Sequence, residues 1–307
     1  MKSKHRIIHD STLRDSAQTR GIEFSFFEKL AITQALGDAG VHEIDIGSAE
    51  MCDQGIDEIR KIAALGLKSR LVVSGQMREA DLLRCLSTGV EMISLSIPVS
   101  DQYIQLRHQP DRASILNQIS CLVRKARDAG VQVVVCAEDA SRAEESFVLR
   151  VAEVAQEAGA RRLCYADTFS VLDPFESQAR ISRLVSGTDL EIEMQAHDGL
   201  GMATANSLAA YIAGASVIGT SVDCMHEGAQ GASLRHFVNA LWQIHQVPAG
   251  IDLQRLACVS TLLGLATGRT SVAGHHDPFE RLMSSLDISD PVSFGENHQT
   301  SLSAISH

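Results

Sequence analysis

The stretch Ile7–Gln18, which reads IIHDSTLRDSAQ, decides how the rest of the chain is interpreted. A short apolar run ends at Asp10, and the adjacent charges Arg14 and Asp15 follow it. In barrel enzymes, charged side chains lie in this way at the carboxyl-terminal end of a strand, on the loop that leads from the strand to the next helix. We therefore look for other strand ends that bring side chains toward Arg14 and Asp15.

Short apolar runs alternate with longer stretches of helical periodicity as far as about residue 250. Strands are expected over residues 6–10, 42–47, 70–74, 92–97, 132–137, 162–166, 190–194 and 217–222. The first long helix is expected after Ser25, because Ser25 and Glu28 have the spacing of a capping box. A doubly wound sheet shows the same alternation, but eight strand–helix units favour an α/β fold of the TIM (β/α)8 barrel type.

Composition places few further limits on the domain organisation. Only 6 of the 307 residues are Pro and 45% are hydrophobic, which favours one main domain with a large core. We expect the barrel over residues 1–250, a short C-terminal helical extension over 251–272 and a polar, poorly ordered tail over 273–307.

Charge and cysteine content exclude several classes of partner. The net charge of -11 argues against nucleic acid or an anionic membrane as a partner. No apolar run is long enough to span a bilayer, and no signal-peptide core follows Met1. The 7 scattered cysteines form no CxxC pair, so the sequence predicts reduced thiols in a cytoplasmic protein.

Polar and charged side chains follow the predicted strands. They are Glu43, Asp45, Glu138, Asp139, Asp167, Thr168, Gln195, His197, Asp198, Asp223, His226 and Glu227. Because the carboxyl ends of barrel strands meet at one face, we expect these groups to converge there. Carboxylates with imidazoles suit a divalent cation, and a neighbouring Arg14 would stabilise an enolate or a carboxylate.

Several of these residues, and some others near the strand ends, also have a purely structural interpretation. The structural interpretations are helix caps or loop-amide acceptors for Asp10 and Asp167, a surface ion pair for Arg14 and Asp15, a packed imidazole for His197, a helix cap for Glu138, and core packing for Cys136 and Cys164. Spacing alone leaves the functional and the structural interpretations open.

Several segments in the same order resemble one enzyme family. Asp10–Gln18 resembles the DTTLRDGEQ signature of the homocitrate synthase, 2-isopropylmalate synthase and citramalate synthase family, also called DRE-TIM metallolyases. The resemblance continues through Glu138–Arg142, Ala166–Thr168 and His197–Ala210. Within this family, the chain resembles above all the homocitrate synthases of nitrogen fixation.

The resemblance implies an acyltransferase that condenses acetyl-CoA, or another acyl-CoA, with a 2-oxo acid such as 2-oxoglutarate. It also implies a divalent metal (Mg, Mn or Zn) that chelates the 2-oxo acid. The resulting assignments are Arg14 and Glu138 as catalytic residues, Gln18, Glu43 and Thr168 as substrate-binding residues, and Asp15, His197, Gln195 and His226 as metal ligands.

The chain departs from the family pattern at the metal site. Gln195 stands where the family has the first His of an H-x-H pair, and Gly231 stands at its metal-associated Asn. The catalytic His of the family's C-terminal segment has no clear counterpart, and His275-His276 matches it poorly. We therefore expect weaker metal binding than in the family.

Two alternatives to the acyltransferase stay open. One is a catalytically impaired paralogue that acts as a binding or partner subunit. The other is a retro-aldol lyase of the same superfamily. In each case we expect a homodimer or a pairing with a homologous chain.

Overall fold

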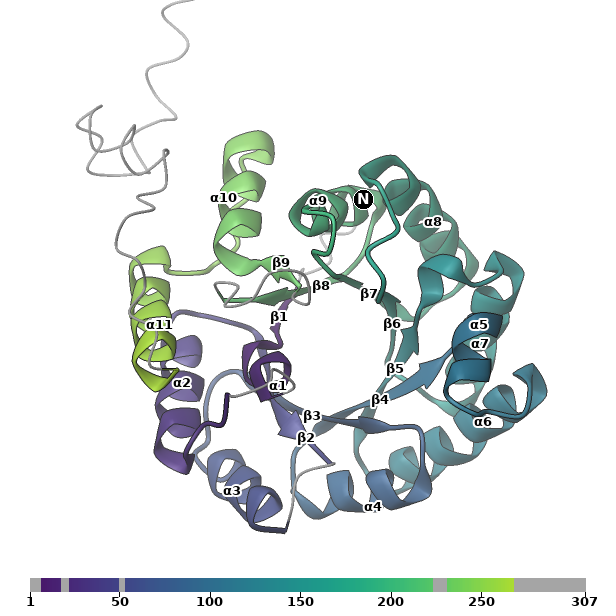
Figure 1. The fold of residues 1–307 in the computed structure, drawn as a ribbon, viewed down its shortest axis with the longest axis horizontal. Helices are drawn as coiled ribbons and strands as arrows, with labels where there is room; N and C mark the ends of the chain where they lie inside the picture. The colour runs from purple at the N-terminus through teal and green to yellow at the C-terminus, as the bar shows by residue number, and fades with distance from the viewer. Residues whose placement is uncertain (1–6, 18–21, 50–52, 223–230, 268–307) are drawn as a thin grey trace, which may run out of the picture. The chain divides into compact units, whose positions relative to one another are not determined.

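The computed structural model describes residues 7–17, 22–49, 53–222 and 231–267, and its strands close into a barrel (Figure 1). Strands β1 to β8 are parallel, each pairs with the next, and β8 pairs with β1. They are β1 Ile7–Asp10, β2 Glu43–Ser48, β3 Arg70–Gln76, β4 Met92–Pro98, β5 Gln132–Glu138, β6 Arg162–Asp167, β7 Glu191–Ala196 and β8 Val217–Ser221, with a short β9, Ala232–Ser233, beside β8. The predicted TIM (β/α)8 barrel is confirmed.

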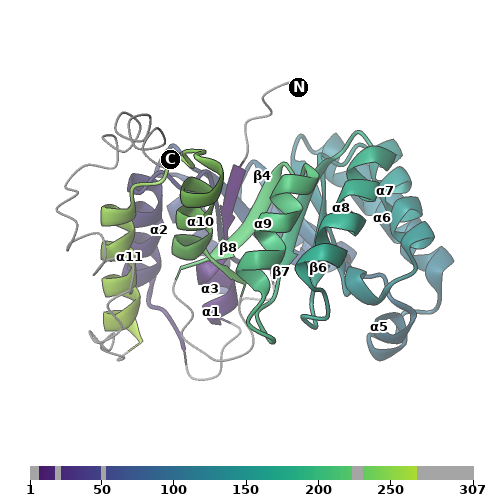
Figure 2. The same cartoon turned by 90° about the horizontal axis from the view of Figure 1, so that it is seen from above.

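Helices connect successive strands and surround the barrel (Figures 1 and 2). They are α1 Thr12–Ala17, α2 Phe26–Asp38, α3 Asp53–Ala63, α4 Glu79–Ser87, α5 Asp101–Leu106, α6 Arg112–Asp128, η1 Ala140–Arg142, α7 Glu145–Ala158, α8 Pro174–Gly187, α9 Ala203–Ala213, α10 Leu234–His245 and α11 Leu253–Ala266. Helix α1 is set apart from the outer ring, because it contacts β2 and β8 (Figure 1).

Helices α1 and α5 and the turn η1 form where the sequence indicated loops. The start of α1 is held by Asp10, whose carboxylate accepts hydrogen bonds from the Thr12 backbone N–H at 3.1 Å and from the Thr12 hydroxyl at 2.9 Å. Such a local cap can hold one or two turns that are too short to show a hydrophobic period. The predicted loop carrying Arg14 and Asp15 is therefore helical.

The longer elements begin and end where local chemistry predicts. Ser25 and Glu28 form both hydrogen bonds of the capping box, so this prediction is confirmed. Gly40, beyond the end of α2, has a φ of +88°, a conformation that side chains disfavour. A Cβ there would lie 2.5 Å from the Gly250 carbonyl oxygen, so only glycine lets these two backbones approach.

The barrel interior is filled in chemical layers. Charged side chains occupy the amino-terminal end, and several belong to the first residues of their strands: His9, Glu43, Arg70, Arg162, Glu191 and Glu193. We call this set the floor network. A small apolar cluster is formed by Val72, Met92, Val134, Cys136, Cys164 and Ala166. The predicted core packing of Cys136 and Cys164 is confirmed.

Helix α11 lies within the predicted C-terminal extension and packs against α2. Its buried residues are Leu256, Val259 and Leu263, and the Asp252 N–H donates to the Ala39 carbonyl at 2.8 Å. One compact unit extends to Thr267 and includes this helix, whereas the predicted tail lies outside the described residues. Among the described helices, none has the length and apolar character needed to cross a membrane.

Candidate active site

Arg14 is the central cation at the carboxyl-terminal end of the barrel. Its Nε and Nη2 donate to Asp15 Oδ1 at 3.0 and 2.9 Å, and its Nη1 donates to Asp45 Oδ2 at 3.3 Å. The Arg14 side chain is only 11% exposed, so the interpretation as a surface ion pair is wrong. Burial disfavours the charged guanidinium, but Asp15 and Asp45 outweigh this and raise the pKa of Arg14. Arg14 is therefore a fixed positive charge.

Asp45 supports Arg14 from strand β2. Its Oδ2 also accepts a hydrogen bond of 2.5 Å from the Ser74 hydroxyl, and its side chain is fully buried. Burial raises the pKa of Asp45, although Arg14 and His9 act in the opposite direction. Sequence reasoning placed Asp45 at the end of β2 without giving it a role. The sequence could have indicated a role for Asp45 at the site, because Asp45 lies nearer the carboxyl end of β2 than Glu43 does.

Both carboxylate oxygens of Asp15, predicted as a metal ligand, already accept hydrogen bonds. Arg14 occupies Oδ1, and the Ser11 hydroxyl donates to Oδ2 at 2.6 Å. A metal would have to replace or share these contacts. The structure therefore brings Asp15 to the predicted face of the barrel as part of a hydrogen-bonded ion pair.

Glu138 and Thr168 lie at the ends of adjacent strands, β5 and β6. Glu138 is an ion-pair partner of Arg107, with 3.7 Å between Oε2 and Nη2. The Thr168 hydroxyl oxygen accepts a hydrogen bond of 2.8 Å from the Asp139 backbone N–H, so its own hydrogen can point toward a ligand. Glu138 does not cap a helix, because Glu144 precedes α7.

His197 follows β7 with one ring nitrogen engaged. Its Nδ1 lies 3.1 Å from the Asp167 carbonyl oxygen, which makes Nδ1 the donor in the neutral imidazole and leaves Nε2 with its lone pair. Metal-bound histidines use this arrangement, and so do general bases. The carboxylate of Asp167 accepts from the Val171 and Leu172 backbone N–H groups, which confirms its structural interpretation as a loop-amide acceptor.

The side chain of Gln195 faces the two interior thiols. Its Oε1 lies 3.6 Å from Cys164 Sγ and 3.9 Å from Cys136 Sγ, and the residue is buried. Hydrogen bonding to Cys136 and burial raise the pKa of Cys164 well above its usual range, so this thiol stays neutral. The Gln195 side-chain carbonyl is turned toward this thiol.

The donors present in the described residues do not fit a divalent metal. No group of three His, Cys, Asp or Glu side chains in these residues can hold an ion. Both oxygens of Asp15 already accept hydrogen bonds from Arg14 and Ser11, and Gln195 faces thiols. Of the predicted ligands in this part of the chain, His197 alone presents a ring nitrogen without a hydrogen bond to a described residue. His226, a predicted ligand, and Gln18, a predicted substrate contact, lie outside the described residues.

Glu43 lies at the opposite end of the barrel, so its predicted place at the substrate face is wrong. It is the first residue of β2 and is nearly fully buried. Arg162 donates to its two oxygens at 2.7 and 2.9 Å, and Arg70 donates at 2.7 Å. The side chains of residues 43 and 45 point to the same face of the strand. The alternation of residues in the sequence therefore did not show which of them lies at the carboxyl-terminal end of the barrel.

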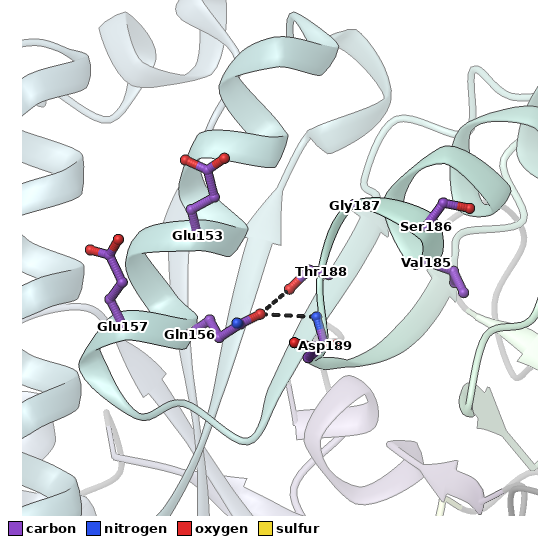
Figure 3. A pocket seen from close by; sticks show the side chains of 8 residues that line it. All are labelled: Glu153, Gln156, Glu157, Val185, Ser186, Gly187, Thr188 and Asp189. Carbon is purple, nitrogen blue, oxygen red and sulfur yellow. Dashed lines mark hydrogen bonds between the residues drawn. The ribbon is translucent and has the colours of Figure 1, made fainter.

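A surface cavity of about 400 Å³ lies away from this site (Figure 3). It is formed by the end of α7 and the connection from α8 to β7, which is the amino-terminal side of the barrel strands. Gln156 spans part of it, because its Oε1 accepts from the Thr188 hydroxyl at 2.6 Å and from the Asp189 N–H at 2.9 Å (Figure 3). Its wall carries Glu153 and Glu157, so it is unsuited to anionic substrates.

Known proteins provide three comparisons. The 2-isopropylmalate synthase 2 of Caldanaerobacter subterraneus subsp. tengcongensis is 37% identical over 87% of this chain and 70% of its own length. Homocitrate synthase 1 of Nostoc sp. is 38% identical over 85% of this chain and 70% of its own length. An HMG-CoA lyase from Acenitobacter baumannii has a TM-score of 0.77 at 18% identity, covers 91% of this chain and 98% of its own, and shows the shared fold.

A family model described as HMGL-like matches residues 5–263, which is most of the chain and the whole barrel. The signature stretch from Asp10, with Arg14 and Asp15 at the barrel mouth, lies inside this match. The barrel, the signature and these matches together show that the chain belongs to the HMGL-like family.

Proposed function

We propose that this chain condenses an acyl-CoA thioester with a 2-oxo acid. The overall reaction forms a bond between the acyl α-carbon and the keto carbon, and water then cleaves the thioester to release CoA. The named relatives are synthases for 2-isopropylmalate and for homocitrate, which supports this class of reaction. The observation that carries the proposal is the buried, permanently charged Arg14 at the carboxyl-terminal end of the barrel.

Arg14 would stabilise the oxygen on which negative charge develops. When the enolate attacks the 2-oxo acid, the keto oxygen becomes an alkoxide, and a fixed guanidinium nearby lowers the energy of this transition state. Asp15 and Asp45 hold the guanidinium on two sides, so little reorganisation is needed during the reaction. Arg14 itself stays protonated throughout.

Glu138 and Thr168 have different roles in this proposal. Glu138 would take the proton from the acyl α-carbon, and its place at the end of β5 with a side chain only 15% exposed supports this role. Thr168 would donate its hydroxyl hydrogen to the carboxylate of the 2-oxo acid. Nε2 of His197, which has no hydrogen bond to a residue that the structure describes, is a further acceptor at this face.

The test is the release of CoA from acetyl-CoA in the presence of 2-oxoglutarate, pyruvate or 2-oxoisovalerate, followed with a thiol reagent. We expect release with at least one of them, and Arg14→Gln should lower kcat/KM by about 100-fold or more. Arg150→Gln, at an exposed arginine on α7, is the matched control and should leave the rate unchanged. Absence of release with all three acids, with and without added Mg²⁺, Mn²⁺ or Zn²⁺, would contradict the proposal.

A second candidate is a binding or partner subunit without turnover. The contacts of Asp15 with Arg14 and Ser11, and those of Gln195 with the thiols, favour it because they leave no metal donor set among the described residues. Calorimetry with the same 2-oxo acids separates the two candidates. Binding of an acid without any CoA release favours the subunit, whereas release establishes the enzyme.

A further inference from the structure

Two arginines and two aromatic rings form a continuous row on the loops at the carboxyl-terminal face. The Arg107 guanidinium lies 5.1 Å from the ring centroid of Tyr103, and the rings of Tyr103 and Phe169 meet edge to face at 5.6 Å. The Arg142 guanidinium lies 4.0 Å from the Phe169 centroid. We call these four residues the cation–aromatic row. They come from α5 and the residue after it, from η1 and from the loop after β6, which are separate in the sequence.

A buried hydrogen-bond network around Asp139 stabilises the cation–aromatic row. Asp139 has a φ of +58°, and its carboxylate binds Arg142 through Nε at 2.8 Å and Nη2 at 2.7 Å. Ser100, which caps α5, donates its hydroxyl hydrogen to the same carboxylate. Asp139 adopts this uncommon backbone conformation and is fully buried, so the network fixes the position of Arg142.

The same network connects the row to the candidate site. The backbone N–H of Asp139 donates to Thr168, and the residue before it, Glu138, is the ion-pair partner of Arg107. A ligand that reaches Glu138 and Thr168 therefore has the cation–aromatic row beside it.

The row is exposed in part: Tyr103 is buried, with 9% of its surface exposed, whereas the other three members reach solvent. Phe169 is 44% exposed, and Leu106 and Val171 on the same loops are 64% and 49% exposed. Arg142 and Arg107 keep 33% and 43% of their side chains exposed, and Arg142 Nη1 makes no hydrogen bond to a described residue. Both arginines are ion-paired, Arg107 with Glu138 and Arg142 with Asp139, so the row offers a phosphate guanidinium N–H groups rather than an excess of positive charge.

We propose that this row binds the nucleotide end of the acyl-CoA. Adenine stacks on planar aromatic and guanidinium groups, and arginine donates paired hydrogen bonds to phosphates. The flexible pantetheine arm of CoA would then carry the thioester to Glu138 and Thr168. This inference rests on the proposed function, because it assumes that an acyl-CoA is the substrate.

The test compares CoA with a thiol that lacks the nucleotide. Calorimetry gives the Kd of the full chain for CoA, and assays with the acetyl thioester of N-acetylcysteamine give the rate without a nucleotide. Loss of one stacking surface costs about 10-fold in affinity, so Phe169→Ala and Arg107→Gln should each weaken CoA binding by about that factor. The rate with the short thioester should stay within twofold of the wild type in Phe169→Ala, whereas Arg107 is paired with Glu138 and its variant is assessed by the Kd for CoA alone.

Phe175→Ala and Arg183→Gln are matched controls. Phe175 is an exposed ring on α8, and Arg183 is an exposed arginine paired with Glu145, and both lie outside the row. They should leave the Kd for CoA unchanged. Wild-type affinity in both row variants would overturn the inference and leave the proposed function standing. Absence of CoA binding by the wild type would overturn the inference and remove the support for the proposed function.

Discussion

At the scale of single residues, the ability of the site to bind a metal depends on the hydrogen bonds that the side-chain oxygens of the predicted ligands already accept. Asp15 and Gln195 lie where the resemblance predicts metal ligands, yet Arg14, Ser11 and the two thiols occupy their acceptor atoms. The family signature is therefore retained in sequence, while the hydrogen bonds around it favour an ion pair. Sequence comparison detects the residues but does not report which partner each atom has taken.

Restoring the family residues should restore metal affinity. Gln195→His adds an imidazole beside His197, and Gly231→Asn adds an amide near the buried Ser221 hydroxyl, which has no hydrogen-bond partner among the described residues. A Cβ on Gly231 would lie 3.6 Å from the Ala196 carbonyl oxygen, an ordinary contact. By calorimetry with Mn²⁺ or Zn²⁺, the double variant should bind at least about 10-fold more tightly than the wild type.

The matched control is Gln243→His on the exposed surface of α10, which adds a histidine away from the site. Unchanged affinity in the double variant would show that positions 195 and 231 do not limit metal binding. If His197→Ala did not reduce the affinity of the double variant, His197 would be excluded as a ligand.

At the scale of strands, the floor network couples β1, β2, β6 and β7 through buried charges. Arg162, which is fully buried, joins Glu43 on β2 to Glu193 on β7, and His9 on β1 donates to Glu193 at 2.7 Å. Burial alone would lower the pKa of His9, but Glu193 reverses this and raises it to about 9. Burial likewise opposes ionisation of Glu193, but His9 and Arg162 lower its pKa to about 2.

These shifts predict how stability depends on pH. Because the pKa of His9 is raised in the folded state, its stabilisation is complete below about pH 6.5 and is lost as the pH rises through 9. For Glu193 the stabilisation is complete above about pH 4.5 and is lost as the pH falls through 2. The free energy of unfolding in urea should therefore fall by up to about 3 kcal/mol between pH 6.5 and 9.

His9→Gln is the control for this pH dependence, because the amide can still donate to Glu193 but does not titrate. This variant should lose most of the decline above pH 6.5. An equal decline in His9→Gln and in the wild type would mean that another group is responsible.

The barrel itself was predictable, because eight apolar runs with helical stretches between them leave few other topologies. Helix α1 was not, since six residues are held by the Asp10 cap and show no period. Glu43 was misplaced for another reason. Alternation along a strand identifies the inward face but not the depth of a residue inside the barrel, and depth separates Glu43 in the floor network from Asp45 beside Arg14.

At the scale of the whole molecule, substitutions in α11 test whether the barrel and this helix unfold in one cooperative transition. The helix buries Leu263 against the compact unit, whereas Leu265, two residues further, is 73% exposed. If barrel and helix unfold together, Leu263→Ala should lower the free energy of unfolding by about 2–5 kcal/mol in a single urea transition. Leu265→Ala should change it by less than about 0.5 kcal/mol. The Gly40–Gly250 contact and the Asp252–Ala39 hydrogen bond give the reason for coupling, because they fix the start of α11 on the end of α2. A wild-type midpoint in Leu263→Ala, or a separate first transition, would show instead that the helix is an independent appendage to the barrel.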